Sequence, residues 1–194
     1  MSKTPVETQI EVSTHTAALN FVTNQTITMF LKYVNQRGLD TAYLTRNRDI
    51  LEDGIWTWLA GRHLEKAVLE VYRDDDDTLV ERLDLPFAYT KPDEVDAETA
   101  QQLQEQDFES FHEVVLEHVQ DLDAPPEDCR CRVIVSLQDN EDGQAPPPVD
   151  GWTKSSFRDT DHLSREDLGD WLDGGSIQSS ASFWFSNTTE PEDT

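Results

Sequence analysis

The best candidates for chemistry are Asp159, Asp161 and His162, which lie within four positions of one another. Two carboxylates and an imidazole can ligate a divalent cation, and a water bound to that cation would serve a metal-dependent hydrolase. This cluster has no partner elsewhere, because His112 and His118 are six positions apart and would face different sides of a helix. We therefore expect neither a metal nor a cofactor, and keep the hydrolase only as an alternative function.

No other segment carries the spacing of a catalytic or phosphate-binding motif. The sequence lacks the phosphate loop GxxxxGK[ST], the dinucleotide pattern GxGxxG after a strand and the GxSxG turn of serine hydrolases. The only cysteines, Cys129 and Cys131, lie two positions apart, which is a poor geometry for a disulfide within one strand. Cys131 lies in an apolar alternation, where a buried and inert thiol is expected. The sequence predicts a protein that is not an enzyme.

The charge of the chain restricts its partners. The 194 residues suffice for one domain with a packed core, and 40 acidic against 15 basic residues give a net charge of −25. Phosphate backbones and anionic membranes attract cations, so neither nucleic acid nor a membrane is expected as a partner. No apolar run reaches the roughly 20 residues of a membrane span, and the first residues do not form a secretory signal, which predicts a cytoplasmic location. So acidic a surface needs salt to screen it, which indicates a halophilic source such as a haloarchaeon.

Apolar periodicity predicts helices followed by a β-hairpin in the first half of the chain. Steps of three and four residues predict one helix over 16–36 and another over 49–60, each closed by a glycine. Alternating apolar residues then predict strands over 64–72 and 79–89. The four consecutive aspartates between them are typical of an exposed turn.

The second half predicts a helix over 99–122, a strand around Val133 and a proline-rich acidic linker over 138–150. After the linker come more large apolar side chains than a disordered tail would carry. They are Trp152, Phe157, Trp171, Ile177, Phe183, Trp184 and Phe185. The residues themselves leave two alternatives open: the tail packs permanently on its own core, or it closes over a peptide that adds a strand to a sheet edge.

Several blocks of the sequence resemble the bacterial HORMA-domain proteins and follow that family's order. The blocks are residues 13–16 (STHT), 21–23 (FVT), 54–59 (GIWTWL), 63–72 (HLEKAVLEVY) and 149–161 (VDGWTKSSFRDTD). The chain departs from the family in the acidic region 90–128, which lacks the family's glycine-rich stretch, in the long linker 138–150 and in the extended acidic end.

The resemblance implies an α+β HORMA fold, in which an antiparallel sheet with a β-hairpin packs on about three helices and a C-terminal safety belt wraps a closure-motif peptide. The belt residues expected to hold the peptide are Trp152, Phe157, Arg158 and Trp184. The expected divisions are a flexible N-terminal arm 1–12, a HORMA core 13–137, a linker 138–150, a safety belt 151–186 and a disordered acidic tail 187–194.

The resemblance also implies a function in the CBASS anti-phage operons. The expected protein is a non-catalytic signalling adaptor, whose peptide-bound form binds and activates a nucleotidyltransferase that makes a cyclic oligonucleotide. An AAA+ ATPase remodeller of the same operon would open the closed form by pulling on the arm, with Thr4, Val6, Ile10 and Val12 as its handle. The alternative within the same fold is a HORMA-like scaffold for a complex unrelated to defence.

Overall fold

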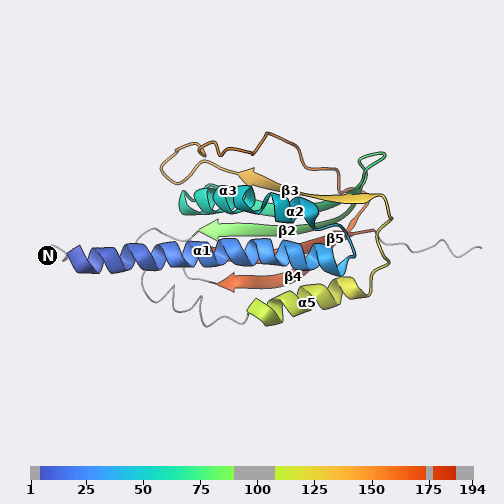
Figure 1. Ribbon diagram of the computed structural model, residues 1–194, viewed down its shortest axis with the longest axis horizontal. Helices are drawn as coiled ribbons and strands as arrows, with labels where there is room; N and C mark the ends of the chain where they lie inside the picture. Colours follow the sequence, from blue (N-terminus) through green and yellow to red (C-terminus); the bar gives the residue numbers. More distant parts are fainter. Residues whose placement is uncertain (1–4, 90–107, 174–176, 187–194) are drawn as a thin grey trace, which may run out of the picture.

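One antiparallel sheet organises the molecule, with helices packed against one of its faces (Figure 1). The computed structural model describes residues 5–89, 108–173 and 177–186, and side chains from residue 16 onward. The strand order is β3-β1-β2-β5-β4, with every neighbouring pair antiparallel. The strands are β1 Leu64–Arg73, β2 Leu79–Tyr89, β3 Cys129–Leu137, β4 Ser164–Asp173 and β5 Ile177–Phe185. The predicted α+β class is confirmed.

Three of the helices lie where the periodicity predicts them, one of them with an extension, and the short helix α2 was not predicted. They are α1 Pro5–Gln36, α2 Ala42–Arg46, α3 Arg48–Ala60 and α5 Phe108–Gln120. Gly38, at φ +69°, follows the end of α1, and Gly61 caps α3, as the sequence predicts. The helix predicted from residue 16 begins at Pro5, so the backbone of residues 5–12, including Val6, Ile10 and Val12, is helical. Thr4 and residues 99–107 of the predicted third helix lie outside the described residues.

The β1–β2 hairpin is the centre of the sheet and is confirmed as predicted. Leu69 pairs with Leu83, and the apolar side chains on this face join the helices in the core. The connection between the strands holds the consecutive aspartates, and Asp77 takes a positive φ of 62° there. Short polar side chains tolerate that conformation, which explains why this turn is rich in aspartate.

The aromatic tail enters the sheet as a second hairpin. β5 pairs with β2 and carries the fully buried Phe183, while β4 lies at the sheet edge and buries Trp171. The sequence does not predict these strands, because β4 reads SREDLGDWLD and two register shifts interrupt its pairing. Docking of the tail aromatics on the chain's own core is therefore confirmed for these residues.

A buried polar cluster joins α1, β2 and the end of α5. Arg37 donates to both carboxylate oxygens of Glu81 and to the carbonyl of Val119 at 3.1 Å, and the hydroxyl of Tyr33 donates to Glu81. Burial and the neighbouring Glu81 raise the pKa of Tyr33 well above its usual value, so the phenol stays neutral. No helix in the described part of the chain is long and apolar enough to cross a membrane.

Candidate functional site

The outer edge of β3 is the starting point of the site. β3 pairs with β1 through one edge, and it stands last in the strand order of the described residues. An edge strand presents unpaired backbone N–H and C=O groups, which can hydrogen-bond to another extended chain. The side chains of Val133 and Ile134 are buried, so the edge has a defined position on the core.

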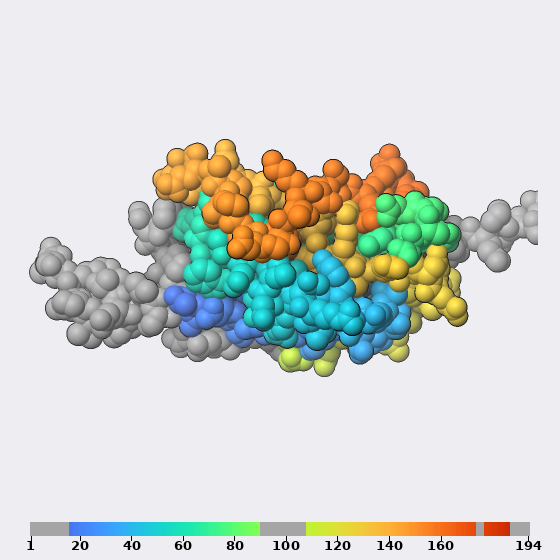
Figure 2. Space-filling model, turned by 45° about the horizontal axis from the view of Figure 1, so that its top comes forward, coloured from blue at the N-terminus to red at the C-terminus, as the bar shows by residue number. Residues whose placement is uncertain are grey.

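Residues 146–158, which we call the strap, run back along this edge in the opposite direction to β3. After β3 the chain turns through a loop in which the N–H of Asn140 donates to the carbonyl of Gln144. The indole of Trp58 then donates to the carbonyl of Pro147 at 2.9 Å. At the other end, the guanidinium of Arg132 donates to the hydroxyl of Ser155 at 3.0 Å. Figure 2 shows the strap, in orange, lying over the teal surface of α3.

Between these contacts a cavity of about 760 Å³ lies among the strap, β3 and the helices. One wall comes from α2, the α2–α3 junction and α3, the floor from β3, and the outer wall from the strap. The lining residues are Tyr43, Asn47, Ile50, Leu51, Trp58, Arg132, Val133, Ile134, Val135, Leu137, Pro146, Pro147, Pro148, Val149, Gly151, Trp152, Thr153, Lys154 and Ser155. The cavity therefore lies between the strap, which closes over it, and an edge of β3 to which no described strand is paired.

Trp152 fastens the middle of the strap to α3. Its indole donates to the carbonyl of Ile50 at 2.9 Å, and its ring meets Trp58 edge-on with centroids 5.0 Å apart. A Cβ at Gly54 would lie 2.3 Å from the indole nitrogen, so the absence of a side chain at Gly54 makes room for this ring. A Cβ added at Gly151, whose φ is +84°, would lie 2.9 Å from the side chain of Ile50. Two glycines thus let the strap lie directly on α3.

Arg158 fastens the end of the strap to the sheet face that the helices leave free. Its guanidinium donates to Glu70 Oε2 at 3.0 Å and to Asp77 Oδ1 at 2.7 Å, and it stacks 3.5 Å over the ring of Tyr72. The backbone N–H of Arg158 also donates to Glu70 at 3.0 Å. Burial alone would lower the pKa of Arg158, but its bonds to Asp77 and Glu70 raise it, so the group stays charged.

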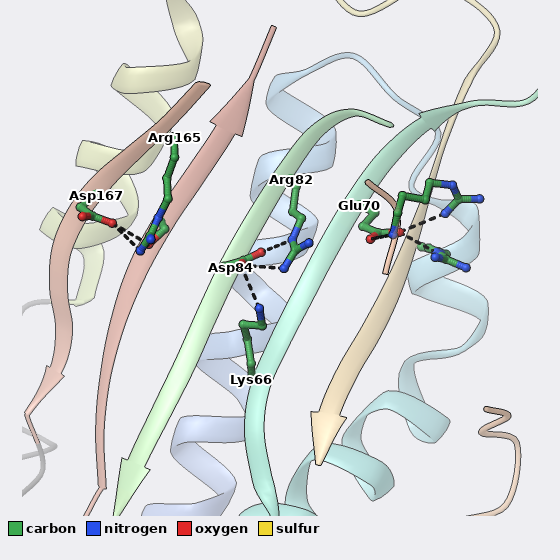
Figure 3. A network of polar contacts seen from close by, with 9 residues as sticks. Lys66, Glu70, Arg82, Asp84, Arg165 and Asp167 are labelled. Atoms are coloured by element: carbon green, nitrogen blue, oxygen red, sulfur yellow. Dashed lines mark hydrogen bonds and ion pairs between the residues drawn. The ribbon is translucent and has the colours of Figure 1, made fainter. Parts of the chain in front are cut away.

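Glu70 is the buried centre of this fastening (Figure 3). Its side chain is 0% exposed, and its carboxylate accepts from Arg158 and from Arg132, the latter at 2.8 Å. A buried carboxylate is tolerated when cations and hydrogen bonds surround it. Glu70 thus connects β1, β3 and the strap through one group.

Phe157 and Trp184 lie on the same face of the sheet but do not line the cavity. Phe157 lies under the ammonium of Lys66 at 4.8 Å and the guanidinium of Arg82 at 4.7 Å. Trp184, on β5, lies against Arg82 and Arg165. Since β1 and β2 separate β5 from β3, Trp184 is remote from the cavity. Of the four predicted peptide contacts, only Trp152 faces it.

The predicted chemical cluster does not form a metal site in the described residues. His162 places Nε2 2.7 Å from the carbonyl oxygen of Leu79, and Asp159 accepts the backbone N–H of Asp161 at 3.0 Å. Nowhere in the described ranges do three His, Cys, Asp or Glu side chains converge. The structure gives the hydrolase alternative no support.

The cysteines are free thiols, and burial raises the pKa of Cys129 and Cys131 to about 11, which keeps them protonated and unreactive.

Several site residues were not predicted from the sequence: Ile50, Trp58, Glu70 and Arg132. Gly54 carried a usable signal, because a glycine inside a helix costs about 1 kcal/mol and needs a packing reason. The three consecutive prolines carried another, since they cannot continue a helix or a central strand and suit an extended strap. Glu70 carried no signal in the sequence, because the role of a charged residue within an apolar strand becomes visible only when its partners are known.

Comparisons with known proteins identify the family and the fold. The family model described as bacterial HORMA domain 2 matches residues 7–187, while no curated protein matches the chain. The structure of C. elegans HTP-2 bound to HTP-3 closure motif 1 is similar at a TM-score of 0.65 and 17% identity, covering 86% of this chain and 85% of that one. A chain of the mitotic checkpoint complex is similar at 0.64 and 14% identity, covering 87% and 98%. The E. coli MS115-1 CdnC:HORMA-deltaN complex reaches only 0.47 at 8% identity, over 86% of each chain, and supports no conclusion.

Proposed function

The chain belongs to the bacterial HORMA domain 2 family, and we propose that it clamps an extended partner peptide between β3 and the strap. The observation that carries this proposal is the cavity of about 760 Å³ along the edge of β3 that pairs with no strand in the described residues. A peptide entering it would add a strand to the sheet, with backbone hydrogen bonds for affinity and side-chain pockets for specificity. The solved relative HTP-2 carries a closure motif on the same fold, which supports this use of the cavity.

The strap makes such a peptide slow to leave. It is fastened on both sides of the cavity, by Trp58 and Ile50 of α3 and by Arg132 and Glu70 of the sheet. A peptide lying between the strap and β3 is enclosed laterally, so release requires these contacts to break. We therefore assign the strap to the belt function, with Trp152 as a peptide contact and Arg158 and Phe157 as its anchors on the sheet.

We extend the proposal to signalling on the strength of the family resemblance. The peptide-bound protein acts as a non-catalytic adaptor that binds and activates a cyclic-oligonucleotide-synthesising nucleotidyltransferase in antiviral defence, in the cytoplasm. An AAA+ ATPase remodeller acts on the first residues, where α1 begins at Pro5. A helical handle has to unwind before the ATPase can thread it. Because the handle lies apart from the proposed peptide site, deletion of residues 1–12 should block release by the ATPase and leave peptide binding intact.

The clamp is tested with wild-type protein and the Trp152→Ala and Trp184→Ala variants as baits in a lysate of the source organism. Truncation after the linker is unsuitable, because it removes β5 and with it the fully buried Phe183. A captured protein that binds wild type and Trp184→Ala but not Trp152→Ala is then examined by hydrogen exchange. The clamp is supported if a segment of that captured protein protects the backbone amides of β3 from exchange. Equal retention by all three baits contradicts it.

The signalling role is tested separately from the clamp. Purified protein, its captured peptide and the nucleotidyltransferase encoded nearest to its gene are combined with nucleoside triphosphates, and cyclic products are measured. Synthesis that depends on both the protein and the peptide supports the defence adaptor. A captured peptide with no effect on synthesis favours the alternative, a HORMA-like scaffold for a complex unrelated to defence.

A further inference from the structure

The cavity under the strap differs in charge from the rest of the molecule. The chain carries 40 acidic residues among 194, yet among the described residues that line the cavity there is no Asp or Glu. The two charged residues in the lining, Arg132 and Lys154, are both basic. In a protein with a net charge of −25, this is a local reversal of sign at the place where a partner would bind.

The basic residues gather at one end of the cavity. The strap runs antiparallel to β3, so Ser155 lies beside Arg132 near the start of β3, and Lys154 belongs to this end. Arg132 and Arg158 share the single carboxylate of Glu70, and Arg158 also pairs with Asp77. No ion pair involves Lys154 within the described ranges. Lys154 is therefore the charged lining residue whose ammonium is not already paired with a carboxylate of the described chain.

The opposite end of the cavity is apolar and aromatic. Pro147 lies beside Trp58 near the end of β3, where Leu137 and the neighbouring prolines complete the lining. Val133 to Leu137 span roughly 13 Å of strand at about 3.3 Å per residue, which sets the length of a paired peptide at about five residues. Alternate side chains of such a peptide point to the same face. The cavity can thus select a peptide by the apolar side chains at one end and by the charge of one side chain at the other.

We infer that the partner of this cavity is an acidic peptide, with apolar residues toward Trp58 and an Asp or Glu toward Lys154. The inference rests on the proposed clamp and specifies its ligand. A basic residue at the same position would meet Lys154 and Arg132 and be repelled. The net negative charge of the protein repels an anionic partner at long range, but salt screens charges beyond about 8 Å. The cations nearest to the bound peptide therefore determine which peptide charge is preferred.

The probe is a phage library of random peptides of about twelve residues, selected on the full-length protein in salt that screens its net charge. The strongest binder is synthesised with a fluorophore, and its Kd is measured by anisotropy for wild type, Lys154→Glu and the matched control Arg165→Glu. Arg165 lies on β4, at the opposite edge of the sheet, and its side chain is 52% exposed. An exposed ion pair changes an affinity by up to about fivefold, and reversal replaces attraction by repulsion.

The expected result is an acidic residue to one side of the apolar positions in the selected peptides. Lys154→Glu should then weaken binding about tenfold or more, Arg165→Glu should change it less than about twofold, and an Asp→Lys peptide should prefer Lys154→Glu over wild type. Neutral or basic peptides that bind wild type but not Trp152→Ala would overturn the charge preference and leave the clamp standing. If no peptide is enriched, or if all bind Trp152→Ala equally, the clamp itself fails.

Discussion

The Gly54→Ala variant should open the strap while the helices and the sheet stay folded. In an ordinary exposed helix, alanine in place of glycine stabilises by about 1 kcal/mol. Here the added Cβ would stand 2.3 Å from Nε1 and 2.6 Å from Cε2 of Trp152, far inside van der Waals contact. The helix backbone cannot yield, but the strap can, so the indole leaves its place on α3.

The Gly54→Ala substitution lowers the stability of the closed strap relative to the open one. Trp152 loses its hydrogen bond to the carbonyl of Ile50, worth about 1 kcal/mol, and its edge contact with Trp58, worth about 1 kcal/mol. A loss of about 2 kcal/mol raises the local opening equilibrium about 30-fold, since about 1.4 kcal/mol corresponds to a factor of ten. The lost apolar contact area adds to this figure.

Hydrogen exchange measured by mass spectrometry distinguishes opening of the strap from a change in the stability of the whole fold. Peptides from the strap should lose protection in Gly54→Ala, while those from β1 and β2 keep theirs and the melting temperature does not fall. A double-mutant cycle with Trp152→Ala is the control, because without the indole the Gly54→Ala change should act as a plain helix-stabilising substitution. Unchanged strap protection in Gly54→Ala would refute the assigned packing.

Three further predictions follow from single contacts or from the charge. Arg158→Ala removes charge-assisted bonds to Glu70 and Asp77 and should destabilise strap closure by about 2–4 kcal/mol in hydrogen exchange, whereas Arg165→Ala, a more exposed control, should change it by less than about 1 kcal/mol. Burial and the nearby Lys32 lower the pKa of His112 to about 4, below the unfolded value near 6.5, so its contribution is present above pH 6.5 and is lost as the pH falls toward 4. The wild type should lose about 2 kcal/mol more than His112→Asn between pH 7 and pH 5 in denaturant titrations, and equal losses would contradict this. Added salt should raise the melting temperature, because it screens a net charge of −25, and a fall on adding salt would argue against an adaptation to salt.

Local patterns determined the elements whose partners are close in sequence. The helix over 49–60 and the strands over 64–72 and 79–89 could be placed because a helix repeats every 3.6 residues and a strand every two. Their glycine and aspartate boundaries follow from backbone conformations that few residues adopt. Trp152 could be selected for its size and its place after the prolines.

Only the tertiary structure decided which strand edge is free and what closes over it. β4 is too charged and too irregular in register to show an alternation, and its place depends on pairing with β5, which in turn pairs with β2. The same holds for the strap: Glu70 and Arg158 are 88 positions apart, and Trp152 lies 102 positions from Ile50. Periodicity indicates which face of a helix or strand is buried. Contacts between residues so far apart in sequence depend on strand order and chain direction, which no local sequence pattern determines.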